Sequence, residues 1–282
     1  MRLWGWLILL LWATGAGAAE LALSPPRIAA GGVALLRYQG EGPVSAVGHC
    51  NGKTFDLTPL ADGAMALIGI DLASAAGPYP VQVDLTDAHG HRRRLKVTLQ
   101  VAKGVYPEER LTLPKEMVTP SQPATLKRID REQALLKDLL ARQSSGWPGA
   151  VFVPPVSDPV GSPFGLRRIL NGLPKAPHGG IDFRSPAGRP VAATAAGTVV
   201  FAGELYFTGT TVILDHGGGL FSLYAHLQAS TCQVGQSLGA GEVLGLVGAT
   251  GRSTGPHLHW GVRLRGDRID PMALLSLAGE RP

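Results

Sequence analysis

Short stretches in which apolar and polar residues alternate fill much of the chain between residues 20 and 102. Val81, Val83 and Leu85 alternate with polar neighbours, and a second run at 95–99 does the same. Because residues two apart in a strand point to the same face, each run predicts a half-buried β-strand. Turn residues such as Gly31-Gly32 and Asn51-Gly52 separate the runs. Residues 20–102 are therefore predicted to form a small β-sandwich domain.

The pattern changes over residues 103–150, which we interpret as a linker with one helix. Four prolines between residues 107 and 123 exclude a long regular element there. From residue 126 to about 142 the apolar positions fall mainly on one face of a helix, at Leu126, Ile129, Leu136, Leu139 and Leu140. This helix either packs between two domains or serves as a lid or partner-binding element, and the pattern favours packing.

Residues 151–282 are again rich in apolar strand patterns, now with many glycines. The segments 197–203, 211–216 and 241–248 read as strands, and few helices fit between them. An antiparallel sheet folded onto itself is expected here. The predicted fold class is therefore mainly β, with a β-sandwich, a helical linker and a C-terminal antiparallel sheet domain.

Two histidines lie on one of the predicted strands, in the sequence Gly255-Pro-His-Leu-His-Trp. His257 and His259 are two residues apart and share a face, while Leu258 and Trp260 should face the core. Imidazole is both the commonest metal ligand and the commonest general base. The pair therefore predicts a metal or catalytic site.

Partners for this pair occur upstream. His178 and Asp182 are four residues apart, a spacing that shares a face in a strand, and the two glycines between them make a helix improbable. His226 lies in the run from Phe221 to Leu227, in which alternation places it on the same face as Ser222 and Tyr224. Two imidazoles, one carboxylate and an open position are the ligand set of a catalytic zinc site.

Several motifs together resemble the lysostaphin-type zinc endopeptidases, which cleave peptide bonds in peptidoglycan. The similarity covers about residues 162–271 and includes Ser162-Pro-Phe-Gly-Leu-Arg-Arg168, the His178/Asp182 pair, Tyr224-Ala-His-Leu227 and residues 251–259. The resemblance implies Zn²⁺ as cofactor, with His178, Asp182 and His259 as its ligands. It also implies that His226 and His257 are the catalytic histidines.

The same resemblance bears on the rest of the chain. Residues 20–102 are similar to an immunoglobulin-like β-sandwich, a module that precedes the catalytic domain in many relatives. Because all five candidate residues lie between residues 178 and 259, we expect the domain beginning near Val151 to retain the chemistry alone. Residues 20–150 would then govern access or positioning and contribute no site residue.

The first 19 residues are typical of a signal peptide. Arg2 precedes an apolar stretch at 3–12, which is short for a membrane span, and small residues follow at 16–19. We therefore expect an exported protein of the periplasm or cell envelope, with no stable membrane span after cleavage. The net charge of +5 suits an anionic envelope polymer, and no motif indicates nucleic acid.

Some residues remain open at this level. Cys50 and Cys232 are too few for a disulfide scaffold, and they either pair across the two domains or are two buried thiols. His216 is interpreted as a structural or turn residue and Asn171 as a candidate substrate contact. Tyr224 is either a substrate contact or a half-buried strand residue.

The leading hypothesis is thus a zinc endopeptidase that cleaves stem or cross-bridge peptides of peptidoglycan during wall remodelling. Peptidoglycan is the expected partner, together with a regulatory or adaptor protein of the envelope. The alternative is a non-enzymatic module that binds peptidoglycan and activates another hydrolase. A conventional His-Glu-x-x-His helix motif and a Gly-x-Ser-x-Gly elbow are both absent from the sequence.

Overall fold

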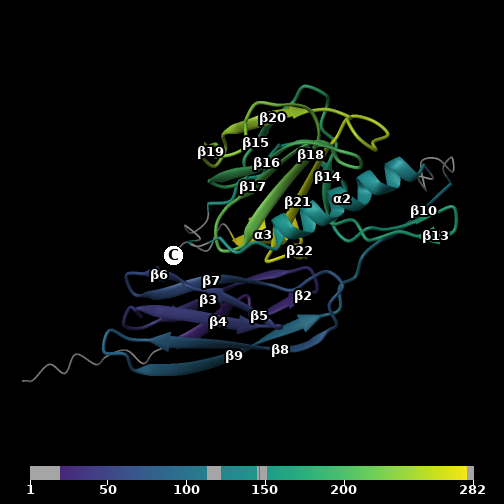
Figure 1. Ribbon diagram of the computed structural model, residues 1–282. Helices are drawn as coiled ribbons and strands as arrows, with labels where there is room; N and C mark the ends of the chain where they lie inside the picture. The colour runs from purple at the N-terminus through teal and green to yellow at the C-terminus, as the bar shows by residue number, and fades with distance from the viewer. Residues whose placement is uncertain (1–19, 113–121, 145, 147–150, 278–282) are drawn as a thin grey trace, which may run out of the picture.

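A computed structural model describes residues 20–112, 122–144, 146 and 151–277 (Figure 1). The described chain is mainly β, as the sequence predicts. The predicted signal peptide, residues 1–19, lies outside the described residues. None of the described helices is long and apolar enough to cross a membrane.

The N-terminal part consists of two sheets that pack on a shared apolar core. The first sheet has the strand order β1 (Glu20–Ser24), β3 (Val33–Gln39), β7 (Gly63–Gly69), β6 (Thr58–Leu60). The second has the order β2 (Arg27–Ala29), β9 (Arg92–Ala102), β8 (Gly77–Thr86), β4 (Ser45–Cys50), β5 (Lys53–Asp56). Apolar side chains of both sheets, among them Leu36, Ile68, Val83 and Leu99, form this core. The immunoglobulin-like assignment remains a prediction.

The first sheet is apolar on both faces, and its outer face packs against the C-terminal part of the chain. Ala34 and Leu36 of β3 face the sandwich core, whereas Val33 belongs to the core of the C-terminal part. Met65 and Leu67 of β7 join Val33 there. Because successive strand residues point to opposite faces, one strand contributes to both cores. The two parts are therefore joined by buried apolar contact and not by the linker alone (Figure 1).

Charged groups reinforce this junction. The guanidinium of Arg268 pairs with the carboxylate of Asp71 at 2.7 Å. Lys53 of β5 pairs with Asp267 at 2.5 Å and donates to the backbone carbonyl of Arg265 at 2.8 Å.

A ten-stranded, mostly antiparallel sheet forms the C-terminal part. Its main path runs β11 (Val160–Ser162), β14 (Gly180–Phe183), β21 (Leu258–Leu264), β18 (Leu220–Ser230), β17 (Gly209–Asp215), β16 (Gly197–Leu205), β19 (Ser237–Leu238). Three further strands pair beside this path: β15 (Pro190–Ala192), β20 (Val243–Val247) and β22 (Asp267–Ile269). The three strands predicted at 197–203, 211–216 and 241–248 correspond to β16, β17 and β20.

A small third sheet connects the linker to the C-terminal part. β10 (Glu108–Leu111) comes from the linker and pairs in parallel with β12 (Arg167–Leu170), which pairs with β13 (Leu173–Pro174). The linker therefore adds a strand beside the region that carries the candidate ligands.

The linker helix α2 (Pro123–Leu140) begins three residues earlier than predicted. Proline is well tolerated at the first helical position, because that position has no intrahelical partner for an N–H. Leu139 and Leu140 pack against Phe221 and Leu223 of β18. In Figure 1 the helix crosses in front of β18 and β21. The short helix α3 (Pro271–Ser276) follows β22, and the side chain of Asp270 caps it.

Candidate active site

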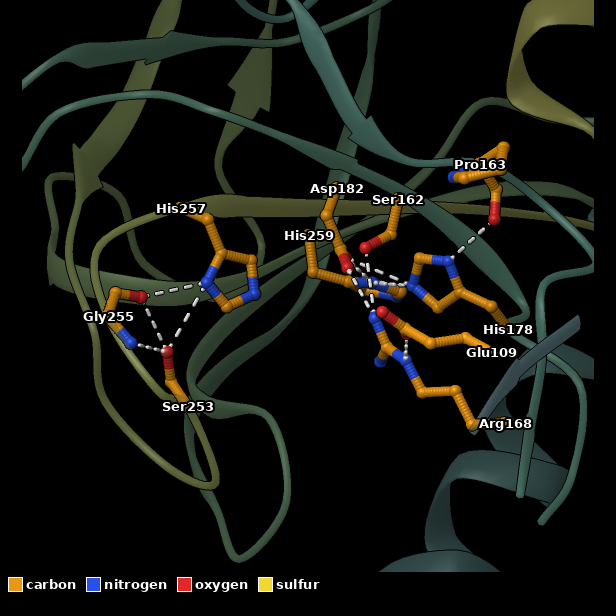
Figure 2. A network of polar contacts seen from close by, with 10 residues as sticks. All are labelled: Glu109, Ser162, Pro163, Arg168, His178, Asp182, Ser253, Gly255, His257 and His259. Atoms are coloured by element: carbon orange, nitrogen blue, oxygen red, sulfur yellow. Dashed lines mark hydrogen bonds and ion pairs between the residues drawn. The ribbon is translucent and has the colours of Figure 1, made fainter. Parts of the chain in front are cut away.

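The predicted metal ligands come together where β14 pairs with β21. Asp182 lies directly opposite His259 in the antiparallel register, and His178 precedes β14 by two residues. The three ligand atoms lie within 4.8 Å of one another. Asp182 Oδ1 is 2.9 Å from His259 Nδ1 and 3.0 Å from His178 Nε2. Figure 2 shows the three side chains directed at one point.

The protonation pattern of this cluster suits a cation. His178 Nδ1 lies 3.0 Å from the carbonyl oxygen of Pro163, so its proton is placed there and Nε2 keeps a lone pair. His259 Nδ1 is only 3.0 Å from that nitrogen. Burial raises the pKa of Asp182, but hydrogen bonds with His178 and His259 outweigh it and hold the pKa well below its usual range. Two imidazoles and an ionised carboxylate that converge in this way fit a zinc ion.

His226 and His257 form a second pair beside the cluster. Their ring centroids are 4.5 Å apart, and the His226 ring is 6.2 Å from the ring of His259. His226 Nδ1 lies 2.8 Å from the carbonyl of Thr250, and His257 Nδ1 lies 2.9 Å from the carbonyl of Gly255. Each carbonyl fixes a proton on Nδ1 and leaves Nε2 with a lone pair. Both rings are therefore oriented as proton acceptors.

Burial lowers the pKa of His226 to about 4. The imidazole is consequently neutral at pH 7 and able to accept a proton.

His226 reaches this position by breaking the alternation of its strand. Ala225 pairs with His259, and Leu223 with Gly261, so Leu223 and Ala225 share the face of His259. Strict alternation would turn His226 away, towards the core that contains Tyr224. Its φ of 59° and the register shift beside it rotate the side chain to the site instead. A non-glycine residue in this region stores strain of about 1–3 kcal/mol and is common at functional sites.

A third group of side chains extends from the metal cluster to the linker. Arg168 Nη2 lies 3.9 Å from Asp182 Oδ2 and donates to Ser162 Oγ at 2.9 Å. Its Nε donates to Glu109 Oε2 of β10 at 3.1 Å (Figure 2). The five predicted residues all come from residues 178–259, and Glu109 of the linker lines the groove in addition to them. The sequence carried no signal for Glu109, because only the parallel pairing of β10 with β12 brings it here.

Two further predictions for individual residues are settled by burial. Tyr224 is fully buried and its hydroxyl accepts from the backbone N–H of Thr194 at 2.7 Å, so the possible substrate contact is wrong. His216 is also buried, between the carbonyl of Ala196 and the hydroxyl of Ser222, as expected of a structural residue.

The remaining open residues lie away from the ligand cluster. Asn171 lies in the exposed turn between β12 and β13. Cys50 and Cys232 are both free thiols.

All five predicted residues line one groove of about 720 Å³. Glu109, Ser162 and Arg168, next to Asp182, and the loop that contains Arg252 and Ser253, next to His257, also line it. Helix α2 packs on the same sheet face, beyond His259, because Leu223 and Ala225 belong to the cluster that holds Leu139 and Leu140. Among the described residues, none of α2 lines the groove itself.

Comparisons with known proteins agree with this geometry. The family "Peptidase family M23" matches residues 176–271. The DD-carboxypeptidase/endopeptidase Mpg of Neisseria meningitidis is 44% identical over 117 residues, which are 41% of this chain and 26% of that protein. The peptidoglycan DD-endopeptidase ShyA of Vibrio cholerae is 39% identical over 108 residues, 38% of this chain and 25% of that protein. The chain thus spans about a quarter of the length of these curated relatives.

One solved structure matches nearly the whole chain. It comes from Pseudomonas aeruginosa, is assigned to peptidase M23, and is 34% identical. The match covers 88% of this chain and 94% of that one, with a TM-score of 0.68. It therefore includes the N-terminal sheets and the linker as well as the candidate site. The chain belongs to peptidase family M23.

Proposed function

We propose that this protein is a zinc-dependent endopeptidase that hydrolyses peptide bonds in the stem or cross-bridge peptides of peptidoglycan. The observation that carries the proposal is the arrangement of five residues. Three converging donors, His178, Asp182 and His259, lie beside two imidazoles, His226 and His257, that keep free acceptor nitrogens. A module that only binds polymer has no need of the second pair.

The substrate class is supported by the names of the relatives. Both curated relatives are named as peptidases that act on DD peptide bonds, and the second name specifies peptidoglycan. We extend this substrate to the present chain because the family match includes His178, Asp182, His226, His257 and His259. The net charge of +5 suits an anionic polymer. Localisation in the periplasm or envelope, and regulation by an adaptor protein, are part of the same proposal.

The proposed mechanism divides the work between the two groups of residues. Zinc held by His178, Asp182 and His259 would supply Lewis acidity towards water and the scissile carbonyl. His226 and His257 each present an Nε2 lone pair to the groove. One imidazole accepts the proton of the attacking water and returns it to the leaving amine. The other, after taking a proton from solvent at Nε2, donates a hydrogen bond to the developing oxyanion.

The carbonyl groups of Thr250 and Gly255 contribute by fixing both rings. Each accepts a hydrogen bond from Nδ1–H, so neither imidazole has to select a tautomer during the reaction. The Ser253 hydroxyl, 3.3 Å from His257 Nδ1, adds a second contact to that ring. Preorganisation of this kind turns two imidazoles into effective acid–base groups.

The experiment that tests the proposal is digestion of purified peptidoglycan sacculi, followed by mass spectrometry of the products. Zinc-loaded protein should release fragments cut at peptide bonds with the glycan strands intact. The metal-chelated protein and the His257→Ala variant are the matched controls and should release almost none. Binding to sacculi without any cleavage would contradict the proposal and favour the non-enzymatic module.

A further inference from the structure

A second hollow lies next to the groove, on the other side of His259. Its volume is about 500 Å³, within the range of about 300–1,000 Å³ found for ligand pockets. It shares His259 and Thr208 with the groove, so the two spaces adjoin. Lys53 of β5, Lys137 of α2, and Gly261 and Arg263 of β21 also line it. The N-terminal domain, the linker helix and the catalytic sheet thus build this cavity together.

The cavity carries an excess of positive charge. Lys53 is paired with Asp267, but neither Arg263 nor Lys137 has an ion-pair partner among the residues that the structure describes. Arg263 Nη1 donates to the carbonyls of Gly179 and Val262, at 2.8 and 2.9 Å. These two contacts use both N–H groups of Nη1, while the N–H groups of Nε and Nη2 and the positive charge of the guanidinium remain. An anion is the ligand that these groups suit.

His259 presents a second unused donor to the same space. Its Nδ1 belongs to the ligand cluster, so a neutral ring carries its proton on Nε2. No acceptor for Nε2 occurs among the described residues. Histidines that bind metals almost always donate this second N–H to a carboxylate, a carbonyl or water.

Gly261 leaves open space beside His259 Nε2 and the Arg263 guanidinium. A Cβ atom at this position would lie 3.5 Å from the carbonyl oxygen of Gly179, 3.6 Å from His259 Nε2 and 3.7 Å from Arg263 Nη1. These are ordinary contact distances, so a side chain would fit where glycine leaves room. A carboxylate that enters this space reaches the Nε2–H of His259 and lies beside the positive charge of Arg263, whose Nη1 is already bonded to the Gly179 carbonyl.

We propose that this cavity is a subsite for a carboxylate of the peptide substrate, which accepts a hydrogen bond from His259 Nε2–H beside the positive charge of Arg263. The inference rests on the proposed function. A peptide that crosses the ligand cluster can extend into the cavity because His259 and Thr208 belong to both spaces. Leu136 and Leu140 of α2 supply an apolar wall for the peptide next to its carboxylate.

The test compares two small probes that differ only in the carboxylate. N-acetyl-D-alanine and its C-terminal amide are titrated into the zinc-loaded, full-length chain, and binding is followed by NMR. We expect the acid to bind about tenfold more tightly than the amide, the effect of one charge-assisted hydrogen-bond pair. Equal affinities would overturn the proposal.

Two variants of Gly261 test whether the preference for the acid arises in this cavity. Gly261→Asp supplies an internal carboxylate next to His259 Nε2 and the Arg263 charge, so the preference for the acid should fall to about twofold or less. Gly261→Ala fills the same space without adding a charge and should retain most of the preference for the acid. Elemental analysis is used to check that both variants hold zinc. A full tenfold preference in Gly261→Asp would show that the probe binds elsewhere, for example at the metal, and would refute the subsite.

A second pair of variants covers the case in which Gly261→Asp fails to fold. Lys137→Gln removes a charge that lines the cavity and should reduce the preference two- to threefold. Lys127→Gln removes the same charge from an exposed position of α2 that does not line it, and should have no effect. Equal effects of the two lysine variants would contradict the proposal. Probe binding needs no turnover, so failure of the subsite is distinguishable from failure to cleave sacculi.

Discussion

Replacement of Glu109 by glutamine should weaken zinc binding although Glu109 touches no ligand. Its carboxylate accepts a hydrogen bond from Arg168, whose guanidinium also lies 3.9 Å from Asp182. When the charge of Glu109 is removed, Asp182 becomes the nearest carboxylate to Arg168. The guanidinium then competes with the metal for Asp182.

The size of this effect follows from distance and exposure. Two unit charges about 4 Å apart interact by about 4 kcal/mol at an effective dielectric constant near 20. The side chains of Arg168 and Glu109 are 35% and 43% exposed, so water screens much of this interaction. Exposed pairs typically contribute about 0.2–1 kcal/mol, whereas Asp182 is 13% exposed and screened less. We therefore expect a loss of about 1.4 kcal/mol, or a tenfold higher zinc dissociation constant.

Competition with a chromogenic chelator at pH 7 measures this constant. Glu108→Gln is the matched control, because Glu108 is the preceding residue of β10 and pairs with Arg110 at 2.7 Å instead. It should change the constant less than twofold. In an Arg168→Gln background, Glu109→Gln should lose most of its effect. A zinc affinity within twofold of the unmodified protein for Glu109→Gln would refute the reasoning.

The remaining predictions concern the ligands, the acid–base pair and the domain junction. His259→Ala should lose zinc and activity together, and full zinc occupancy by elemental analysis would contradict the ligand assignment. His257→Ala should keep zinc and lose about 10²- to 10⁴-fold in turnover of sacculi, and near-normal hydrolysis would exclude the catalytic role. Burial raises the pKa of Asp71, but hydrogen bonds from Arg268 outweigh it and lower the pKa to about 2. The folded pKa is depressed, so this stabilisation is present above about pH 4 and is lost as the pH falls towards 2. Asp71→Asn should therefore cost about 2 kcal/mol at pH 7 in urea unfolding and flatten the pH dependence between 4 and 2. A fragment of residues 151–282 keeps the five site residues but exposes the shared core and lacks the linker strand, so we expect a lower Tm and weaker zinc binding than in the full chain. Equal values would show that the catalytic part is autonomous, as the sequence alone suggested.

The local pattern of the sequence was enough to pair candidate site residues within each segment. The even spacings of His178 with Asp182 and of His257 with His259 place each pair on one face of extended chain. The same rule placed Leu258 and Trp260 in the core, and both are fully buried. Strand geometry is a local property, so residue spacing determines these faces without knowledge of the neighbouring strands.

Only the tertiary structure decided which distant segments meet at the site. Alternation would have turned His226 towards Tyr224, and a backbone bulge that depends on pairing with β17 reverses it. Glu109 reaches Arg168 through a parallel strand pair whose members are about 60 residues apart in sequence. The cavity beside His259 needs Lys53 and Lys137 from two other parts of the chain. The sequence determined which side chains lie on each face of a strand. Long-range strand pairing and packing determined which other side chains those faces meet, because such pairing and packing leave no periodic signal along the chain.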